Sequence, residues 1–203
     1  MKKCRVVLFA LALIFTASYA SAEGLYARGS IGASLVDDST VTVQGYSGSA
    51  EIEFDTGLLF SAAIGSDLGN NTRVEGEVSY MTADVDRIVA GGLYIDLADE
   101  VNVLSLLVNC YYDIETGSTM TPFIGAGIGV ANVEVEGDGS EDDTVFAYQA
   151  GAGIGYAVND STTLELGYRY MATSDPEFQE AGETVEAEVG SHNFYVGVRV
   201  AIQ

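Results

Sequence analysis

The chain has 203 residues, of which 8 are lysine or arginine and 30 are aspartate or glutamate, giving a formal net charge of −22. This charge excludes nucleic-acid binding, because the phosphate backbone of a nucleic acid would be repelled. Hydrophobic residues make up 48% of the chain, which is more than a disordered acidic chain would contain.

The N-terminal segment has the pattern of a secretory signal peptide. A basic start precedes an apolar run at 6–15, and Ala20-Ser21-Ala22 forms a small-residue cleavage site. The run is shorter than the roughly 18 apolar residues that a transmembrane helix requires. We therefore predict a signal peptide of residues 1–22, cleavage before Glu23, and one exported domain of residues 23–203.

The exported domain is more acidic than the whole chain. It retains five arginines and no lysine but all 30 acidic residues, so its net charge is about −25. It keeps a single cysteine, Cys110, and therefore cannot form an intrachain disulfide.

Eight segments of the exported domain alternate between apolar and other residues, as strands with one apolar face do. The last of them sets the apolar residues at even positions from Phe194 to Ile202 against odd positions that include Arg199. Helical spacing fits these segments less well. The predicted strands, in chain order, are 25–36, 51–65, 73–83, 101–114, 121–133, 144–158, 163–173 and 194–202.

The gaps between the predicted strands alternate between short and long. The short gaps are turn-like and lie at 66–72, 115–120 and 159–162, and the long gaps lie at 37–50, 84–100, 134–143 and 174–190. Outer-membrane barrels have an even number of strands, short periplasmic turns and long outside loops. We predict an all-β fold: an eight-stranded antiparallel transmembrane up-and-down β-barrel with both termini in the periplasm.

The charged residues of the predicted strands fall on the face that is not apolar. In the alternative fold, a soluble lipocalin-like barrel or sandwich, this face would meet water together with glycine columns at 125/127/129 and 151/153/155. In a transmembrane barrel it lines the lumen, which eight strands make just wide enough for side chains to fill. The predicted lumen charge network comprises Arg28, Arg73, Arg169, Arg199, Glu53, Glu75, Glu77, Asp113 and Glu165.

We expect these lumen charges to be paired, since a lone charge in such a space costs several kcal/mol. The glycine columns would leave room for arginine and tyrosine side chains of facing strands. Two interpretations follow: a salt-bridged plug that fixes the strand register, or a narrow ion path. The excess of carboxylates in the lumen and the loops would make any leak favour cations.

Three segments carry a resemblance to a known family: Pro122–Ala131 (PFIGAGIGVA), Tyr148–Ala157 (YQAGAGIGYA) and Leu166–Tyr170 (LGYRY). Together with Asn109–Asp113 and Ser191–Asn193, they resemble the small outer-membrane β-barrel family. This family includes OmpA/OmpX-type barrels, porin-family surface antigens and the major surface proteins of rickettsia-like bacteria.

The resemblance covers the whole exported domain, but it does not fix an activity. It implies a bacterial outer-membrane location, contact with outer-membrane lipid and lipopolysaccharide, and recognition of the C-terminal strand by the assembly machinery. Such barrels usually end in an aromatic residue, whereas this chain ends in Ala201-Ile202-Gln203. Phe194 and Tyr195 are the aromatic residues that could replace the C-terminal aromatic residue in this recognition.

No combination of residues predicts a catalytic, cofactor or metal site. The sole histidine, His192, shares the lipid-facing register of Phe194, so we expect an interfacial structural role. Outer-membrane lipid A deacylases carry a His-x-Ser arrangement. Here Phe194 occupies the position of the serine, so the sequence does not match this motif. Cys110 also faces lipid, which predicts an inert thiol. The stretch 138–143 only faintly resembles a calcium loop.

The four long gaps hold 19 of the 30 acidic residues and one basic residue, Arg87. This composition predicts solvated acidic loops. We therefore predict an outer-membrane surface protein or antigen, not an enzyme, that supports envelope integrity and contacts an external ligand through these loops, as an adhesin does. The alternatives are a small passive cation-favouring pore and, third, a lipid-modifying hydrolase.

Overall fold

The computed structural model describes the residues 24–37, 39–42, 49–54, 56–90, 93–96, 100–136, 141–174, 177–180, 183–186 and 190–202. Side chains are described for 24–37, 56–83, 101–134, 143–174 and 190–202. The predicted signal peptide lies outside the described residues. Within the described ranges, no helix has the length and apolar character that a membrane crossing requires.

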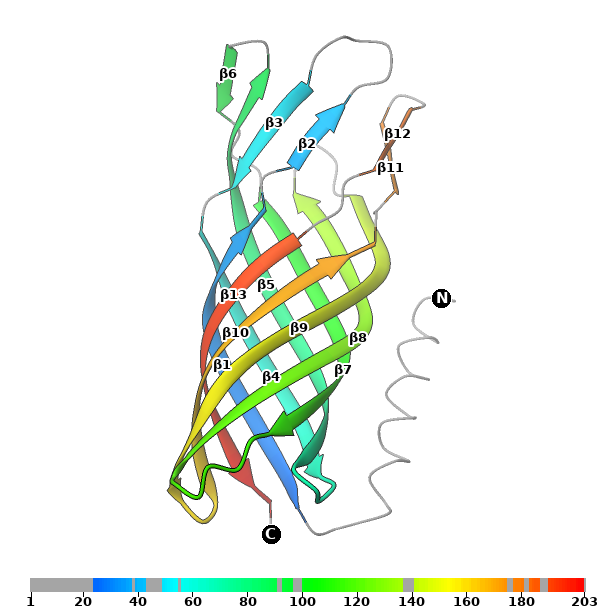
Figure 1. Ribbon diagram of the computed structural model, residues 1–203. Coiled ribbons are helices and arrows are strands. Elements are labelled where there is room, and N and C mark those ends of the chain that lie inside the picture. The colour runs from blue at the N-terminus through cyan, green and yellow to red at the C-terminus, as the bar shows by residue number, and fades with distance from the viewer. Residues whose placement is uncertain are drawn as a thin grey trace.

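Eight antiparallel strands form a closed and strongly tilted barrel (Figure 1). The last wall strand pairs with the first, so the wall has no free edge. This confirms the predicted eight-stranded antiparallel barrel. In order around the wall, the strands are β1 (Leu25–Val36), β4 (Gly57–Asp67), β5 (Thr72–Ala90), β7 (Glu100–Asp113), β8 (Met120–Glu136), β9 (Glu141–Asn159), β10 (Thr162–Thr173) and β13 (Gly190–Ala201).

The strands are staggered around the wall. Followed from Arg28 through β4, β5, β7 and β8, the pairing reaches Ala147 of β9. Followed the other way, through β13 and β10, the pairing reaches Ala157, so one circuit shifts the register by ten residues. Such a stagger tilts the strands and fixes the width of the lumen.

Three tight turns and both described chain ends lie at the same end of the barrel (Figure 1). In the first turn, Asn70 and Asn71 adopt φ values of 50° and 64°, in the left-handed region that asparagine tolerates. Asp67 Oδ1 accepts a hydrogen bond of 2.9 Å from the backbone N–H of Gly69. The tight turns coincide with the three predicted short gaps.

The two faces of the wall have the chemistry of a membrane barrel. On β10, Leu166 points outward with 59% of its surface exposed, whereas the preceding Glu165 faces the lumen and is 3% exposed. Every wall strand carries at least one large apolar side chain that is exposed on the outer face. The predicted alternation is therefore confirmed, and its apolar face is turned to the surroundings as in a lipid-embedded wall.

Strands also continue beyond the wall on the side of the long loops, which the sequence did not predict. β5 was predicted over 73–83 but runs on to Ala90, and β3 (Ser49–Phe54) and β6 (Leu93–Asp96) pair with its extension. β2 (Ser39–Thr42) pairs with β3, and β11 (Glu177–Glu180) forms a separate hairpin with β12 (Glu183–Glu186). These strands project past the barrel rim (Figure 1).

The predicted single strand over 51–65 is divided into β3 and β4. The register against β5 shifts between Glu53 and Phe54, as at a β-bulge. β4 then starts at Gly57, where an added Cβ would lie 1.7 Å from the carbonyl oxygen of Thr82. This close backbone contact admits only glycine, and the alternation of side chains gave no sign of it.

The glycines of the wall yield a matched stability prediction. An added Cβ at Gly125 would lie 2.2 Å from Cδ1 of Tyr111, whereas at Gly29 it would meet nothing within 4 Å. We expect Gly125→Ala to lower the free energy of unfolding by about 1–3 kcal/mol, because the Tyr111 ring must move. Gly29→Ala should change it by less than about 0.5 kcal/mol. Urea titrations of the barrel in lipid vesicles measure both, and equal effects would contradict the lumen packing.

Candidate functional site in the barrel lumen

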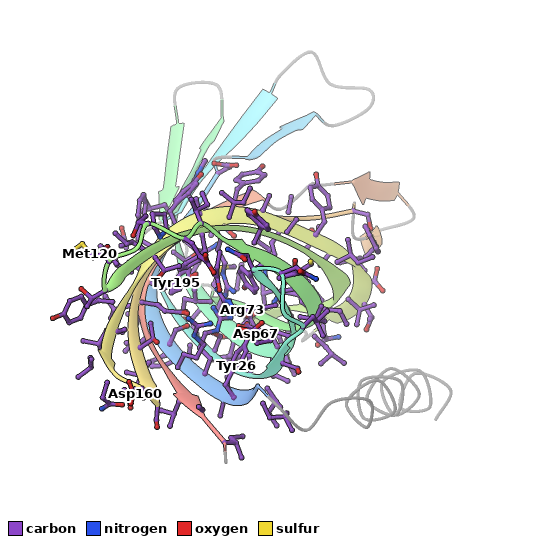
Figure 2. The ribbon with its side chains drawn as sticks, turned by 60° about the horizontal axis from the view of Figure 1, so that its bottom comes forward. Tyr26, Asp67, Arg73, Met120, Asp160 and Tyr195 are labelled. Carbon is purple, nitrogen blue, oxygen red and sulfur yellow. The ribbon has the colours of Figure 1, made fainter. Side chains whose placement is uncertain are left out.

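The side chains inside the barrel form two layers. The layer nearer the tight turns, here called the ionic layer, consists of Arg28, Arg73, Arg169, Arg199, Glu75, Glu77, Asp113 and Glu165. The layer nearer the long loops, here called the apolar layer, contains Leu59, Met81, Val103, Leu107, Ala131, Val133, Val145, Ala147 and Met171, interspersed with buried polar side chains such as Ser79, Ser105 and Asn193. The ring of Tyr195 lies between the two layers, against Arg28 and Arg169. Viewed from the tight-turn end, Figure 2 shows Tyr26, Arg73 and Tyr195 inside the ring of strands.

Arg73 ties three neighbouring parts of the wall together in the ionic layer. Its Nε and Nη2 donate to the two carboxylate oxygens of Asp113 at 2.7 and 2.9 Å, a bidentate pair between β5 and β7. Its Nη1 donates to Glu75 Oε1 at 3.1 Å. The Tyr26 hydroxyl donates to the same Glu75 oxygen at 2.8 Å, so β1 is tied to this group as well.

Arg28 connects strands that are not neighbours in the wall. Its Nη2 lies 2.9 Å from Glu75 Oε2 and also donates to Glu77, both on β5. Its Nη1 lies 3.7 Å from Glu165 Oε2 on β10. β1 is adjacent to neither β5 nor β10, so these contacts span the lumen and constrain its cross-section.

Arg169 and Arg199 complete the ionic layer. Arg169 Nη1 on β10 donates to Glu77 on β5, which lies across the lumen. Arg199 Nε lies 3.3 Å from Glu165 Oε1. The side chain of Arg199 is 17% exposed, which makes it the least buried arginine of the layer.

The ionic layer is a balanced network rather than four separate pairs. Each of its four arginines has a carboxylate oxygen within 3.3 Å. Each of its four carboxylates lies within 3.9 Å of at least two arginines. Shared pairing of this kind offsets the large cost of removing charges from water.

Glu53 is not part of this layer as the structure describes it. It belongs to β3, beyond the closed wall, where its backbone pairs with Arg87 of the β5 extension. Its side chain lies outside the described residues. Among the described lumen side chains, four arginines meet four carboxylates, so the expected carboxylate excess would rest on Glu53 alone. The break between β3 and β4 places Glu53 before the wall begins.

Aromatic rings fill the space between the charges and the glycine columns. The Cζ atom of Arg73 lies 4.8 Å from the ring centroid of Tyr111 and 5.4 Å from that of Phe123, in cation–π range. An added Cβ at Gly125 would overlap Tyr111, and one at Gly153 would lie 2.4 Å from Phe123 Cζ. These glycines make room for aromatic rings rather than for arginine side chains.

The apolar layer was not predicted. Leu59, Val103 and Leu107 face the lumen and are each at most 1% exposed. The sequence held a signal, because Leu58-Leu59-Phe60 and Leu106-Leu107-Val108 are apolar on both faces of otherwise alternating strands. Such runs indicate a strand segment that is dry on both sides.

His192 lies outside the lumen, at the rim on the long-loop side. Its Nε2 is 3.2 Å from Asp37 Oδ1, and its Nδ1 is 2.7 Å from the Tyr168 hydroxyl. The Tyr170 hydroxyl also donates to Asp37, at 3.3 Å. These contacts join the end of β1 to β10 and β13, at the seam where the first and last strands meet.

The other residues considered for chemistry are dispersed. Ser191, next to His192, is buried in the lumen and donates to the Met171 carbonyl at 3.4 Å. Cys110 is a free thiol on the outward face. Among the described side chains, no group of three or more His, Cys, Asp or Glu residues could hold a metal ion.

Comparison with known proteins places the barrel in a family. The model of the outer membrane protein beta-barrel domain matches residues 6–201. The chain belongs to this family. It is therefore a bacterial outer-membrane protein, as the sequence predicted.

Individual relatives are distant but cover nearly the full chain. The outer membrane protein PagN of Salmonella typhimurium is 24% identical over 97% of both chains. A candidate adhesin of Rickettsia prowazekii, RP828, is 25% identical over 100% of both chains. The crystal structure of Neisserial surface protein A has a TM-score of 0.57 at 21% identity and covers 89% of this chain and 98% of its own, which shows the shared fold.

The differing burial of two arginines predicts a graded loss of stability. Arg28→Met should lower the free energy of unfolding by roughly 3–5 kcal/mol, because it leaves buried carboxylates without their central partner. Arg199→Met should cost less, because the side chain of Arg199 is partly exposed at the lumen mouth. Urea titration in lipid vesicles gives both values. An unchanged midpoint for Arg28→Met would show that the network does not support the barrel.

Proposed function

We propose that this protein is a non-enzymatic surface protein with a closed barrel, which supports envelope integrity and binds a cationic partner through its extracellular strands and loops. The observation that carries the proposal is the filling of the lumen by two successive layers of side chains. A barrel closed in this way offers its outer end, not its interior, for function.

The closed lumen argues for a plug over an ion path. An ion moving through the barrel would have to separate the arginine–carboxylate contacts that span the ionic layer. It would then have to pass the tightly packed section around Leu59, Val103 and Leu107, where the few polar side chains, such as Ser105 and Asn193, are themselves buried. Loss of hydration without compensation costs an ion many kcal/mol.

The outer end of the barrel provides the interaction surface. β3 and β6 extend β5 into a sheet beyond the rim, and β11 and β12 form a second projection (Figure 1). The adhesin assignment suggested for the Rickettsia relative and the surface location of the family support a contact role for these segments.

Charge segregation defines the class of partner. Four of the five arginines that follow the predicted cleavage site lie in the ionic layer, which leaves Arg87 as the remaining one. Of the 30 acidic residues, four lie in the ionic layer and 26 lie elsewhere. A surface of this composition attracts cationic peptides or protein patches and repels sulfated or phosphorylated polymers.

Among the described side chains, no serine hydroxyl lies against His192 to act as the nucleophile of a hydrolase. Asp37 and His192 have the spacing of an acid–base pair, but the hydroxyl on the other imidazole nitrogen is the phenol of Tyr168. The hydroxyl of Ser191 is directed into the lumen. A Ser-His-acid mechanism needs a serine within hydrogen-bond reach of the base.

A plugged lumen predicts that the protein conducts no steady ion current. In planar bilayers at neutral pH, the protein should show no steady conductance, only rare small events that favour cations because of the acidic outer end. The double variant Arg28→Ala with Leu107→Ala serves as the control, since it opens both layers and should leak measurably. A steady or anion-selective conductance of the unmodified protein would favour the pore.

The charge of the outer end predicts partner selectivity. Bacteria that display the protein should bind a basic peptide, and should bind heparin no better than cells without it. Replacing the four glutamates at 177, 180, 183 and 186 by glutamine should weaken peptide binding by about tenfold at low salt. Arg199→Met, which lies at the opposite end, should leave this binding unchanged. Strong heparin binding would contradict a cationic partner.

A further inference from the structure

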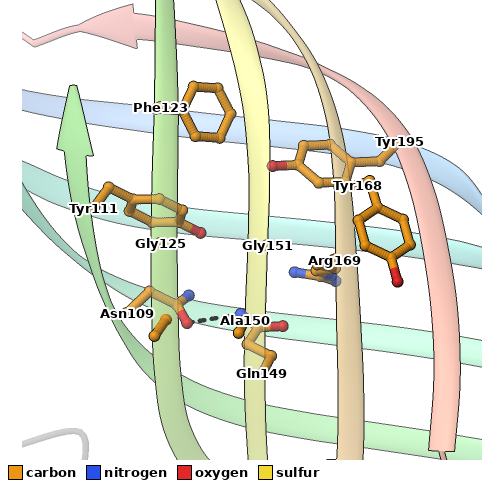
Figure 3. A pocket seen from close by; sticks show the side chains of 11 residues that line it. Asn109, Tyr111, Phe123, Gly125, Gln149, Ala150, Gly151, Tyr168, Arg169 and Tyr195 are labelled. Atoms are coloured by element: carbon orange, nitrogen blue, oxygen red, sulfur yellow. Dashed lines mark hydrogen bonds between the residues drawn. The ribbon is translucent and has the colours of Figure 1, made fainter. Parts of the chain in front are cut away.

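A small internal cavity lies at the boundary between the ionic and apolar layers (Figure 3). Its volume is about 10 Å³, and its lining includes Asn109 of β7, Gln149 of β9 and Arg169 of β10. On each of these strands, the next inward residue toward the long loops is apolar: Leu107, Ala147 and Met171. Aromatic rings, among them Tyr111 and Phe123, line the rest of the cavity, so its polar groups gather on one side.

Residues that line this cavity carry polar atoms that lack a hydrogen-bond partner among the described residues. Gln149 Nε2 donates to Asn109 Oδ1 at 2.7 Å (Figure 3), which leaves Gln149 Oε1 and Asn109 Nδ2 unpaired. Arg169 uses Nη1 for Glu77, which leaves its Nε and Nη2 unpaired. Asn109, Gln149 and Arg169 are only 1%, 5% and 5% exposed, so bulk water does not reach them.

The unpaired donors and the unpaired acceptor determine which molecule or ion fits this cavity. The guanidinium and amide N–H groups require an acceptor, and Gln149 Oε1 requires a donor. Water can accept and donate at once, and a cavity of roughly 10–15 Å³ holds one molecule. A halide would face the oxygen of Gln149 without a proton to offer, and Arg169 is already neutralised by Glu77. A metal cation would be repelled by the guanidinium.

We propose that this cavity binds a single ordered water molecule, which accepts hydrogen bonds from Arg169 and donates one to Gln149 Oε1. This water completes the hydrogen bonding of the ionic layer at its upper limit. It holds Arg169 in line with Glu77.

Solid-state NMR of the protein in lipid bilayers tests this site directly. Magnetisation transferred from water should reach the Arg169 Nε–H several-fold faster than it reaches the methyl groups of Leu107. In Gln149→Met, which keeps the side-chain length but removes the acceptor, the transfer to Arg169 should fall toward the Leu107 rate. Equally slow transfer to both residues in the unmodified protein would overturn the proposal.

Crystals grown from the same protein separate water from an anion. One electron-density peak is expected within hydrogen-bond distance of both Arg169 and Gln149, with no anomalous signal after a bromide soak. A bromide peak at this position would replace the water by an anion. A direct bond from Arg169 to Gln149 with no peak between them would remove the site. The circular dichroism of Gln149→Met should remain that of a barrel, which keeps the NMR comparison valid.

Discussion

A charged side chain inside a narrow membrane barrel has no solvent on either side, and this constraint organises the whole molecule. The wall is surrounded by hydrocarbon and the lumen is packed, so each arginine must meet carboxylates of other strands. The contacts of Arg28 with Glu75 and Glu165 reach strands that do not pair with β1. A slip of one residue in any of these strands would turn a charge toward lipid. We infer that the ionic layer contributes to the choice of register at least as much as to net stability.

The two layers of the lumen divide the tasks of specifying and sealing the barrel. Arginine suits the first task, because its planar fork can contact several carboxylates at once, as Arg73 does with Asp113 and Glu75. The sequence that follows the predicted cleavage site contains no lysine. The apolar layer suits the second task, since close-packed side chains such as Leu107 leave little space in the lumen. Because four of the arginines lie inside the lumen, the acidic residues that lie elsewhere make the outer end of the barrel acidic.

Local pattern was enough to predict the wall, because a strand repeats every two residues and lipid demands one apolar face. β1 was predicted with its observed bounds, and the tight turns were placed by their Asn, Asp and Gly residues. The inward direction of Arg28 and Arg73 followed from the same alternation. What failed depended on contacts between distant segments. The break before Gly57 results from the close approach of Thr82, and the extension of β5 depends on its pairing with β3 and β6.

Which residues line the candidate site could be predicted from the sequence, but which of them pair with one another could not. Four arginines and four carboxylates could be assigned to the lumen from their register, but Glu53 could not be separated from them without the strand break. That Arg28 would meet Glu77 depends on the stagger of the barrel, which no single strand encodes. The apolar layer was overlooked because Leu59 and Leu107 interrupt an alternation that was otherwise informative.

The central claim is that lumen charges stabilise the barrel as interacting partners rather than as separate groups. A double-mutant cycle on Arg73 and Asp113 measures this interaction most directly, using the free energies of unfolding of Arg73→Met, Asp113→Asn and the double variant in lipid vesicles. The account predicts that the double variant loses less stability than the two single losses combined, with a coupling of about 1–3 kcal/mol. Additive losses, with no coupling, would contradict it.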